Sequence, residues 1–171
     1  MIRRVAFKKA IVAGVIGAVA WEAAVRGLIA AGLPMFDLVY TLGTLVPLGE
    51  PAFWKWWAVG MLMHAVVGAI WGIFYAYFFW SLFDRPPALQ GMLFSLLPAA
   101  LAGLIMVPQM DHMHWRMLSG ETPENGFFAN GIGWLGPVTI IVGHLVYGGV
   151  MGSLYKKPVG YPAGRQVPSY G

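Results

Sequence analysis

The amino-acid sequence predicts an all-α fold, a four-helix transmembrane bundle with a short interfacial helix after the first span. The chain of 171 residues is 58% hydrophobic and only 11% charged, whereas soluble domains carry about 25% charged residues. Apolar runs of about 20 residues, long enough to cross a hydrocarbon core of about 30 Å, recur along it. The sequence therefore predicts a multi-pass membrane protein whose first partner is the lipid bilayer.

The first expected span covers residues 5–31. Its basic start and apolar run resemble a signal peptide, but the apolar run continues past Trp21, so we expect an uncleaved helix. The next segment, 32–51, is too short to cross the bilayer and is broken by Pro34, Gly43 and Pro47. This pattern predicts a short interfacial helix.

The three remaining spans are expected at residues 51–83, 88–107 and 132–155. Pro86 and Pro87 form the turn between the first two of these, because proline ends one helix and is well suited to begin the next. A polar loop, 108–131, precedes the last span. The chain is thus expected to contain one transmembrane domain, 1–156, and a Gly- and Pro-rich tail, 157–171, without regular structure.

Basic residues indicate the orientation of the spans. Eight Lys and Arg lie in the termini and in the turn at Arg85, whereas the other two loops hold only Lys55 and Arg116. Cytoplasmic loops carry the excess of basic residues, so we expect both termini in the cytoplasm. The net charge of +4 lies at helix ends and not along one face, which argues against a nucleic-acid partner.

Two segments, 64–75 and 144–155, share the pattern H-x-x-x-G-x-x-x-G-x-x-Y. Their glycines belong to stripes of small residues that recur at every fourth position on all four spans. In lipid, small-x-x-x-small stripes allow close packing of helix backbones. The striped faces are therefore expected to point into the bundle.

Four polar residues fall on or beside these stripes near the expected mid-depth of the bilayer: Glu22, Arg26, His64 and His144. An ionisable group at the centre of a span costs at least ~2.5–3.5 kcal/mol, so we expect one buried polar cluster. It is either structural and self-satisfied or a functional site. His64 and His144 could ligate haem b or a chlorophyll-type pigment, although their glycines are equally explained by helix packing.

The loop after the third span contains "MVPQMDHMHWRM". Thioether and imidazole groups are ligands that soft copper prefers, so Met110, Asp111, His112 and His114 form a candidate metal site. The alternative is structural, because methionine also fills gaps at membrane surfaces and exposed histidines are readily solvated.

The segments "MLMHAVVGAIWGIFYA" and "GHLVYGGVMGSLY" resemble an uncharacterised family of small four-helix bacterial membrane proteins, over residues 8–155. The resemblance implies the architecture and the bacterial cytoplasmic (inner) membrane as the location, and it carries no function. Glu22 and Arg26 depart from the apolar, Met-rich first helix that the family would lead us to expect.

The sequence contains no G-x-S-x-G, H-E-x-x-H or P-loop pattern, so we expect a non-enzymatic protein. The favoured hypothesis is an integral membrane accessory or structural subunit that packs against a larger membrane complex and its lipids, because the chain has little soluble mass and contains eight Trp. One alternative is a haem- or pigment-binding redox or photosynthetic subunit. Another is a small transporter or copper-handling protein. However, the two H-x-x-x-G-x-x-x-G-x-x-Y segments lie on spans expected to cross the membrane in the same direction, whereas many transporters contain inverted repeats.

Overall fold

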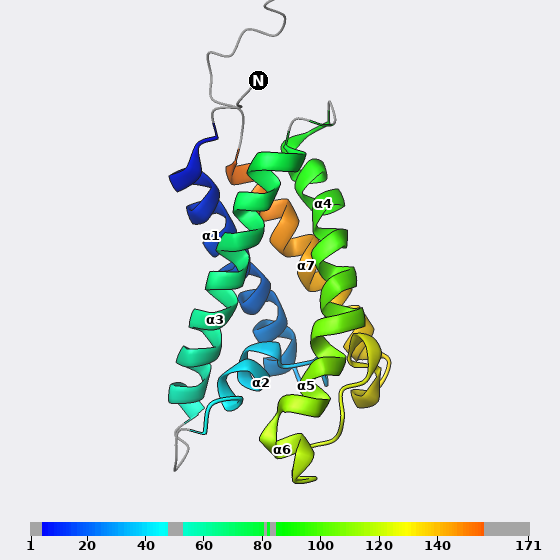
Figure 1. Cartoon of the computed structure of the whole chain (residues 1–171). Helices are drawn as coiled ribbons and strands as arrows, with labels where there is room; N and C mark the ends of the chain where they lie inside the picture. Colours follow the sequence, from blue (N-terminus) through cyan, green and yellow to red (C-terminus); the bar gives the residue numbers. More distant parts are fainter. Residues whose placement is uncertain (1–4, 48–52, 81, 83–84, 156–171) are drawn as a thin grey trace, which may run out of the picture.

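The computed structural model describes residues 5–47, 53–80, 82 and 85–155. These residues form an all-α bundle (Figure 1). Four helical segments in it are long and apolar enough to cross a bilayer: Phe7–Ala30, Phe53–Phe79, Pro87–Met113 and Leu135–Leu154. The predicted four-helix bundle is confirmed, and the chain is a multi-pass membrane protein. The expected tail, 157–171, and residues 51, 52, 81 and 83 of the expected second span lie outside the described residues.

Two spans are single α-helices, α1 (Phe7–Ala30) and α7 (Leu135–Leu154). The other two contain π-helical turns: α3 (Phe53–Phe74) continues into η1 (Tyr75–Phe79), and α4 (Pro87–Leu101) continues through η2 (Ala102–Met106) into α5 (Val107–Met113). Shorter helices gather at the end of the bundle opposite the N-terminus (Figure 1), which we call the α2 end: α2 (Leu38–Thr44), α6 (Trp115–Leu118) and η3 (Phe127–Ile132).

The third span is longer than its expected range, 88–107, because the helix continues through Pro108 to Met113. Proline lacks an N–H group and is excluded from most helix interiors. Here the π turn η2 interrupts the α-helical hydrogen-bond pattern, so Pro108 lies in the first turn of α5, where its missing N–H costs little. The expected polar loop therefore begins after Met113 and not at Pro108.

The helices pack in the order α3, α1, α7, α4, and α2 packs against α3. Figure 1 shows α3 and α4 flanking one face of the bundle, with α7 behind them. These two spans meet through aromatic rings: Phe94 on α4 lies 6.0 Å from Trp71, 5.3 Å from Tyr75 and 5.2 Å from Phe79, measured between ring centroids. On the same face, a cavity lies between this aromatic contact and α2.

Glycines form the tightest seams of the bundle. A Cβ added to Gly148 on α7 would meet the carbonyl oxygen of Gly91 on α4, and one added to Gly14 on α1 would meet the carbonyl oxygen of Gly68 on α3. The small-residue stripes therefore face inward, as the sequence predicts, and they let backbones approach closely.

The expected helix after the first span is present as α2, whose N-cap is Asp37. The Asp37 Oδ1 atom accepts a hydrogen bond from the Tyr40 N–H at 3.0 Å, which satisfies one of the free donors of the first turn. Val39 is completely buried, and a Cβ at Gly60 of α3 would meet its carbonyl oxygen. α2 thus packs closely on α3 and covers the bundle at this end.

Candidate functional site

The structure places the four expected cluster residues in two separate polar groups. In the first group, Glu22 Oε1 accepts hydrogen bonds from Arg26 Nε at 3.0 Å, from Arg26 Nη2 at 2.8 Å and from Trp57 Nε1 at 2.8 Å. Within the described part of the chain, Glu22 makes no hydrogen bond to either histidine. Its hydrogen bonds run instead to Arg26 on the same helix and to Trp57 near the start of α3. The expectation of one four-residue cluster is corrected accordingly.

Arg26 completes this first group through Asp37. Its Nη1 and Nη2 atoms donate to the two carboxylate oxygens of Asp37 at 2.7 and 2.8 Å. Such paired N–H···O bonds are geometrically specific. Since Asp37 is also the N-cap of α2, the ion pairs tie α1 to α2, and Trp57 adds α3. The group therefore has a structural role, because it holds α1, α2 and α3 together at the α2 end.

His64 and His144 form the second group and line one cavity of about 330 Å³. His64 comes from α3 and His144 from α7. The remaining wall is almost entirely apolar and comes from all four spans, from α2 and from the segment before α2. It includes four aromatic residues: Trp21, Phe36, Trp71 and Tyr147. A concave apolar site with a few polar groups is the usual form of a small-molecule site.

The two imidazoles differ in how they are held. His144 Nδ1 lies 2.7 Å from the carbonyl oxygen of Ile140, so this nitrogen carries a proton and donates. The neutral ring, which an apolar surrounding favours, then has a bare, accepting Nε2 atom. His64 Nδ1 is buried and has no hydrogen-bond partner in the described residues.

Aromatic side chains hold the histidines and join the spans. The Trp21 indole meets the His64 ring edge-on, with 5.0 Å between ring centroids, and packs directly on Gly143, beside His144. Its Nε1 atom is also buried without a hydrogen-bond partner in the described residues. The Tyr147 hydroxyl donates to the Gly68 carbonyl at 2.8 Å, which links α7 to α3 across the cavity wall.

The cavity is closed toward the α2 end by Phe36. This side chain is buried, and its backbone N–H donates to Thr139 Oγ1 at 3.1 Å. A second hollow, of about 270 Å³, lies beyond it and is lined by Asp37, His114 and Arg116; Phe36 contributes to both walls. The ring therefore separates the histidine cavity from the polar residues of the α2 end.

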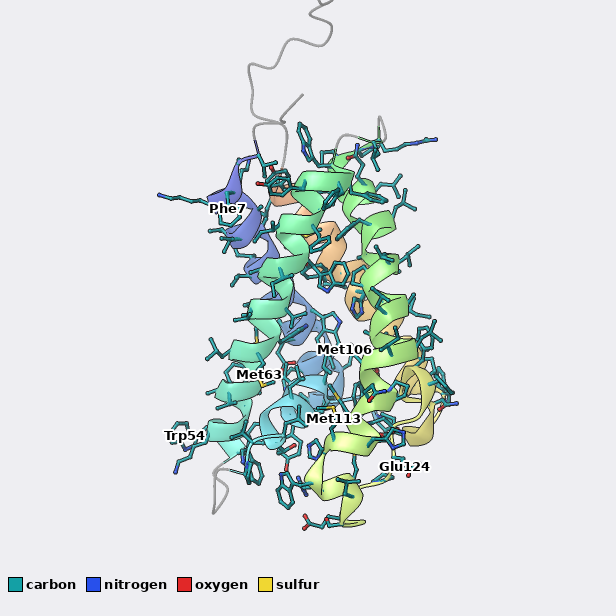
Figure 2. All side chains as sticks on the ribbon, viewed as in Figure 1. Phe7, Trp54, Met63, Met106, Met113 and Glu124 are labelled. Atoms are coloured by element: carbon teal, nitrogen blue, oxygen red, sulfur yellow. The ribbon has the colours of Figure 1, made fainter. Side chains whose placement is uncertain are left out.

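Exposed apolar side chains form the open edge of the cavity. Val67 on α3 faces Leu101, Ile105 and Met106 on the third span, and all four both line the cavity and have exposed surface. Met106 lies at the gap between α3 and this span (Figure 2). In a bilayer such side chains face lipid tails, so the cavity opens laterally toward the membrane interior.

The candidate metal residues do not come together. Met110 is buried and lines the histidine cavity, whereas His112 is exposed. Asp111 accepts hydrogen bonds from the Asn125 and Gly126 backbone N–H groups at 2.7 and 2.9 Å. Among the described residues, no group of three His, Cys, Asp or Glu side chains could hold a metal ion.

His114 is a buried structural residue at the start of α6. Its Nε2 atom lies 3.0 Å from Thr44 Oγ1 and 3.2 Å from the Thr41 carbonyl oxygen, and its Nδ1 atom accepts from the Arg116 N–H at 3.2 Å. Burial lowers the pKa of His114, the hydrogen bond to Thr41 opposes this shift, and Arg116 lowers the pKa slightly further. The ring thus joins α2 to α6 in its neutral form.

Acidification is expected to weaken this contact. Because the folded pKa lies below the ordinary value of about 6.5, the unfolded chain takes up the proton first as the pH falls, and stability falls with it. We expect a lower midpoint of thermal unfolding at pH 5.5 than at pH 7.5, and a smaller difference in His114→Gln. His112→Asn, which alters an exposed ring, should keep the full pH dependence; an unchanged pH dependence in His114→Gln would refute the assignment.

Sequence reasoning missed the aromatic wall and the role of Asp37. The aromatic residues of the cavity carry no motif, although Gly17 and Gly143 leave room for the Tyr147 and Trp21 rings from other helices. Asp37 had a usable signal, because it precedes an apolar helical segment as an N-cap residue does.

Comparison with protein-family models, with curated proteins and with solved structures finds no match to this chain. The resemblance noted for the two histidine-containing segments stays a prediction.

Proposed function

We propose that this chain is a non-enzymatic membrane protein that binds a lipophilic molecule from the bilayer and holds its polar end at His64 and His144. The observation that supports this proposal is the cavity itself, in which His64 and His144 are polar side chains in an almost entirely apolar wall. In an apolar surrounding, such groups cost free energy until they are paired. A bound molecule with a polar head would pair with the polar groups of the cavity.

The lateral opening supports a ligand that arrives through lipid. Phe36 closes the cavity on one side, and the rings around Phe94 close it on the other, so the exposed apolar edge at Ile105 and Met106 is the remaining route. A water-soluble ligand would have to cross lipid to reach it. We propose that both termini lie in the cytoplasm, on the distribution of basic residues, and that the membrane is the bacterial cytoplasmic one, on the resemblance of the two histidine-containing segments.

A haem or tetrapyrrole pigment fits the donors in part and the space poorly. The His144 ring, anchored through Nδ1 on the Ile140 carbonyl, has the arrangement common among metal-ligating histidines. However, a volume of about 330 Å³ is near the lower limit of the ~300–1,000 Å³ found for small-molecule sites, and a four-ring macrocycle is a large cofactor. We therefore favour a smaller molecule.

Photolabelling in native membranes tests the proposal. The probe is a ten-carbon alcohol that carries a diazirine, and labelled residues are mapped by mass spectrometry after illumination. We expect labels on cavity residues such as His64 and Trp71, above the labelling of ordinary lipid-facing positions. Ala102→Trp, which places a large ring in the cavity wall, should reduce cavity labelling several-fold.

The matched control is Leu104→Trp on the same π-helical turn. Leu104 is exposed and lies outside the cavity wall, so this variant adds the same ring without filling the site. Equal cavity labelling in Ala102→Trp and Leu104→Trp, or labelling that follows lipid exposure alone, would overturn the proposal. An absorption spectrum with a band lost in His64→Ala and His144→Ala would favour a haem or pigment instead.

The other predicted functions have less support. A role as an accessory subunit of a larger complex stays a prediction, because lipid can cover the exposed apolar faces of α3 and α4 as well as a partner can. Copper handling loses its motivating cluster, since Asp111 and His114 are engaged in structural hydrogen bonds. Transport has no specific observation in its favour.

A further inference from the structure

We infer that the molecule bound between His64 and His144 is a hydroquinone, a single aromatic ring with two hydroxyl groups and a hydrocarbon tail. This inference rests on the proposed function and names the ligand class.

The polarity of the imidazoles indicates hydroxyl groups. His144 Nδ1 is committed to the Ile140 carbonyl, so the neutral ring offers Nε2 to the cavity as an acceptor, which requires a donor on the ligand. A carbonyl or ether oxygen cannot supply one, but a hydroxyl can. His64 lines the same cavity, and its Nε2 atom donates or accepts according to which ring nitrogen carries the proton, so it matches a hydroxyl in either role.

The wall indicates a flat ring of modest size. Trp21, Phe36, Trp71 and Tyr147 surround the cavity, and aromatic rings pack well against one another in edge-on or offset arrangements. A volume of about 330 Å³ suits one substituted ring near the lower limit of ligand sites. Two polar side chains on two helices also match two oxygens on one ring better than they match a single alcohol.

The lateral edge indicates the tail. Val67, Ile105 and Met106 line the cavity and are exposed on the side that faces lipid. A hydrocarbon chain attached to the ring can pass between α3 and η2 and remain in the bilayer. A free, tail-less hydroquinone would gain nothing from this edge.

Competition against the photoprobe tests the inference. The protein in lipid nanodiscs, kept anaerobic, is labelled with the diazirine alcohol in the presence of decylhydroquinone or of its dimethyl ether, which keeps the ring and the tail but has methyl groups in place of the two hydroxyl hydrogens and therefore no donors. A net hydrogen bond contributes about 0.5–1.5 kcal/mol. We therefore expect decylhydroquinone to suppress cavity labelling at a concentration roughly threefold to tenfold lower than the ether.

His144→Phe should abolish this preference, because the accepting nitrogen is removed while a ring of similar size remains. Cavity labelling of His144→Phe by the photoprobe verifies that the cavity still forms. Ser153→Ala alters a hydroxyl on α7 that bonds to the Gly149 carbonyl, outside the cavity wall, and should keep the preference.

The results separate the inference from the proposed function. If the ether competes as well as decylhydroquinone, or if the preference survives in His144→Phe, the hydroquinone inference is overturned while cavity labelling still supports a lipophilic ligand. If the photoprobe never labels the cavity in a way that Ala102→Trp suppresses, both fail together.

Discussion

Replacing Gly148 by alanine is expected to lower the free energy of unfolding by about 2 kcal/mol, whereas the same change at the adjacent Gly149 should be nearly neutral. The two glycines lie side by side on α7 and are both buried. They differ in what a new methyl group would meet. At Gly148 it would meet the Gly91 backbone and the Ser95 side chain of α4, and at Gly149 the flexible end of Met92.

The physical reason is that a helix backbone cannot yield as a methionine side chain can. α4 and α7 make the most extensive contact of the bundle, and a methyl group at Gly148 would push them apart along the seam. Alanine also gains up to about 1 kcal/mol of helix propensity over glycine, which offsets part of the clash at Gly148 and favours Gly149→Ala.

Unfolding by SDS in mixed micelles, followed by circular dichroism, measures both variants against the unaltered protein. Equal stability of Gly148→Ala and Gly149→Ala would show that the α4–α7 seam is looser than the structure indicates. Because Pro98 on α4 and Ile140 on α7 both line the histidine cavity, we also expect Gly148→Ala to alter photolabelling there, and Gly149→Ala to leave it unchanged.

The fold could be predicted from sequence because hydropathy and proline act locally. An apolar run long enough to cross the bilayer has few alternatives to a helix, and Pro86 and Pro87 mark a turn wherever they occur. At Pro108 the same reasoning gave the wrong end for the third span. Its effect depends on the π turn η2 before it, and a π turn depends on packing between helices that local sequence does not specify.

For the candidate site, the level of each side chain along its helix could be predicted, but the direction in which it points around the helix axis could not. The spacing of residues along a helix gives the level at which a side chain lies, and His64 and His144 do share a cavity. Glu22 was expected at a similar level, yet its carboxylate joins Arg26 and Trp57. Which neighbour a side chain meets at a given level depends on the rotation of each helix about its axis, and partners such as Asp37 come from segments between the spans.

Replacing Asp111 by asparagine is expected to lower the free energy of unfolding by about 3 kcal/mol, since charged hydrogen bonds contribute roughly 1.5–3 kcal/mol each. The Asp111 carboxylate accepts from the Asn125 N–H at 2.7 Å, from Asn125 Nδ2 at 3.0 Å and from the Gly126 N–H at 2.9 Å. Both Asp111 and Asn125 are buried. An amide in place of the carboxylate would direct an N–H₂ group at one of these donors.

The loop that Asp111 holds contains unfavourable backbone geometry. Phe128 and Ala129 have φ angles of 52° and 58°, which cost free energy in residues with a side chain. This loop places Phe128 against Gly103 of η2 and Ala129 against Gly136 of α7. Loss of the Asp111 hydrogen bonds should therefore loosen the start of α7 and the π turn beside the cavity.

His112→Asn separates this structural role from metal binding. His112 is adjacent to Asp111 in sequence, but its ring is exposed. If the four residues formed a copper site, either substitution should weaken copper binding measured by calorimetry, and stability without copper should be similar in both. We expect the opposite pattern. Without any metal, Asp111→Asn should unfold at a lower SDS concentration than the unaltered chain, and His112→Asn should unfold at the same SDS concentration as the unaltered chain. A stable Asp111→Asn variant would contradict the assignment.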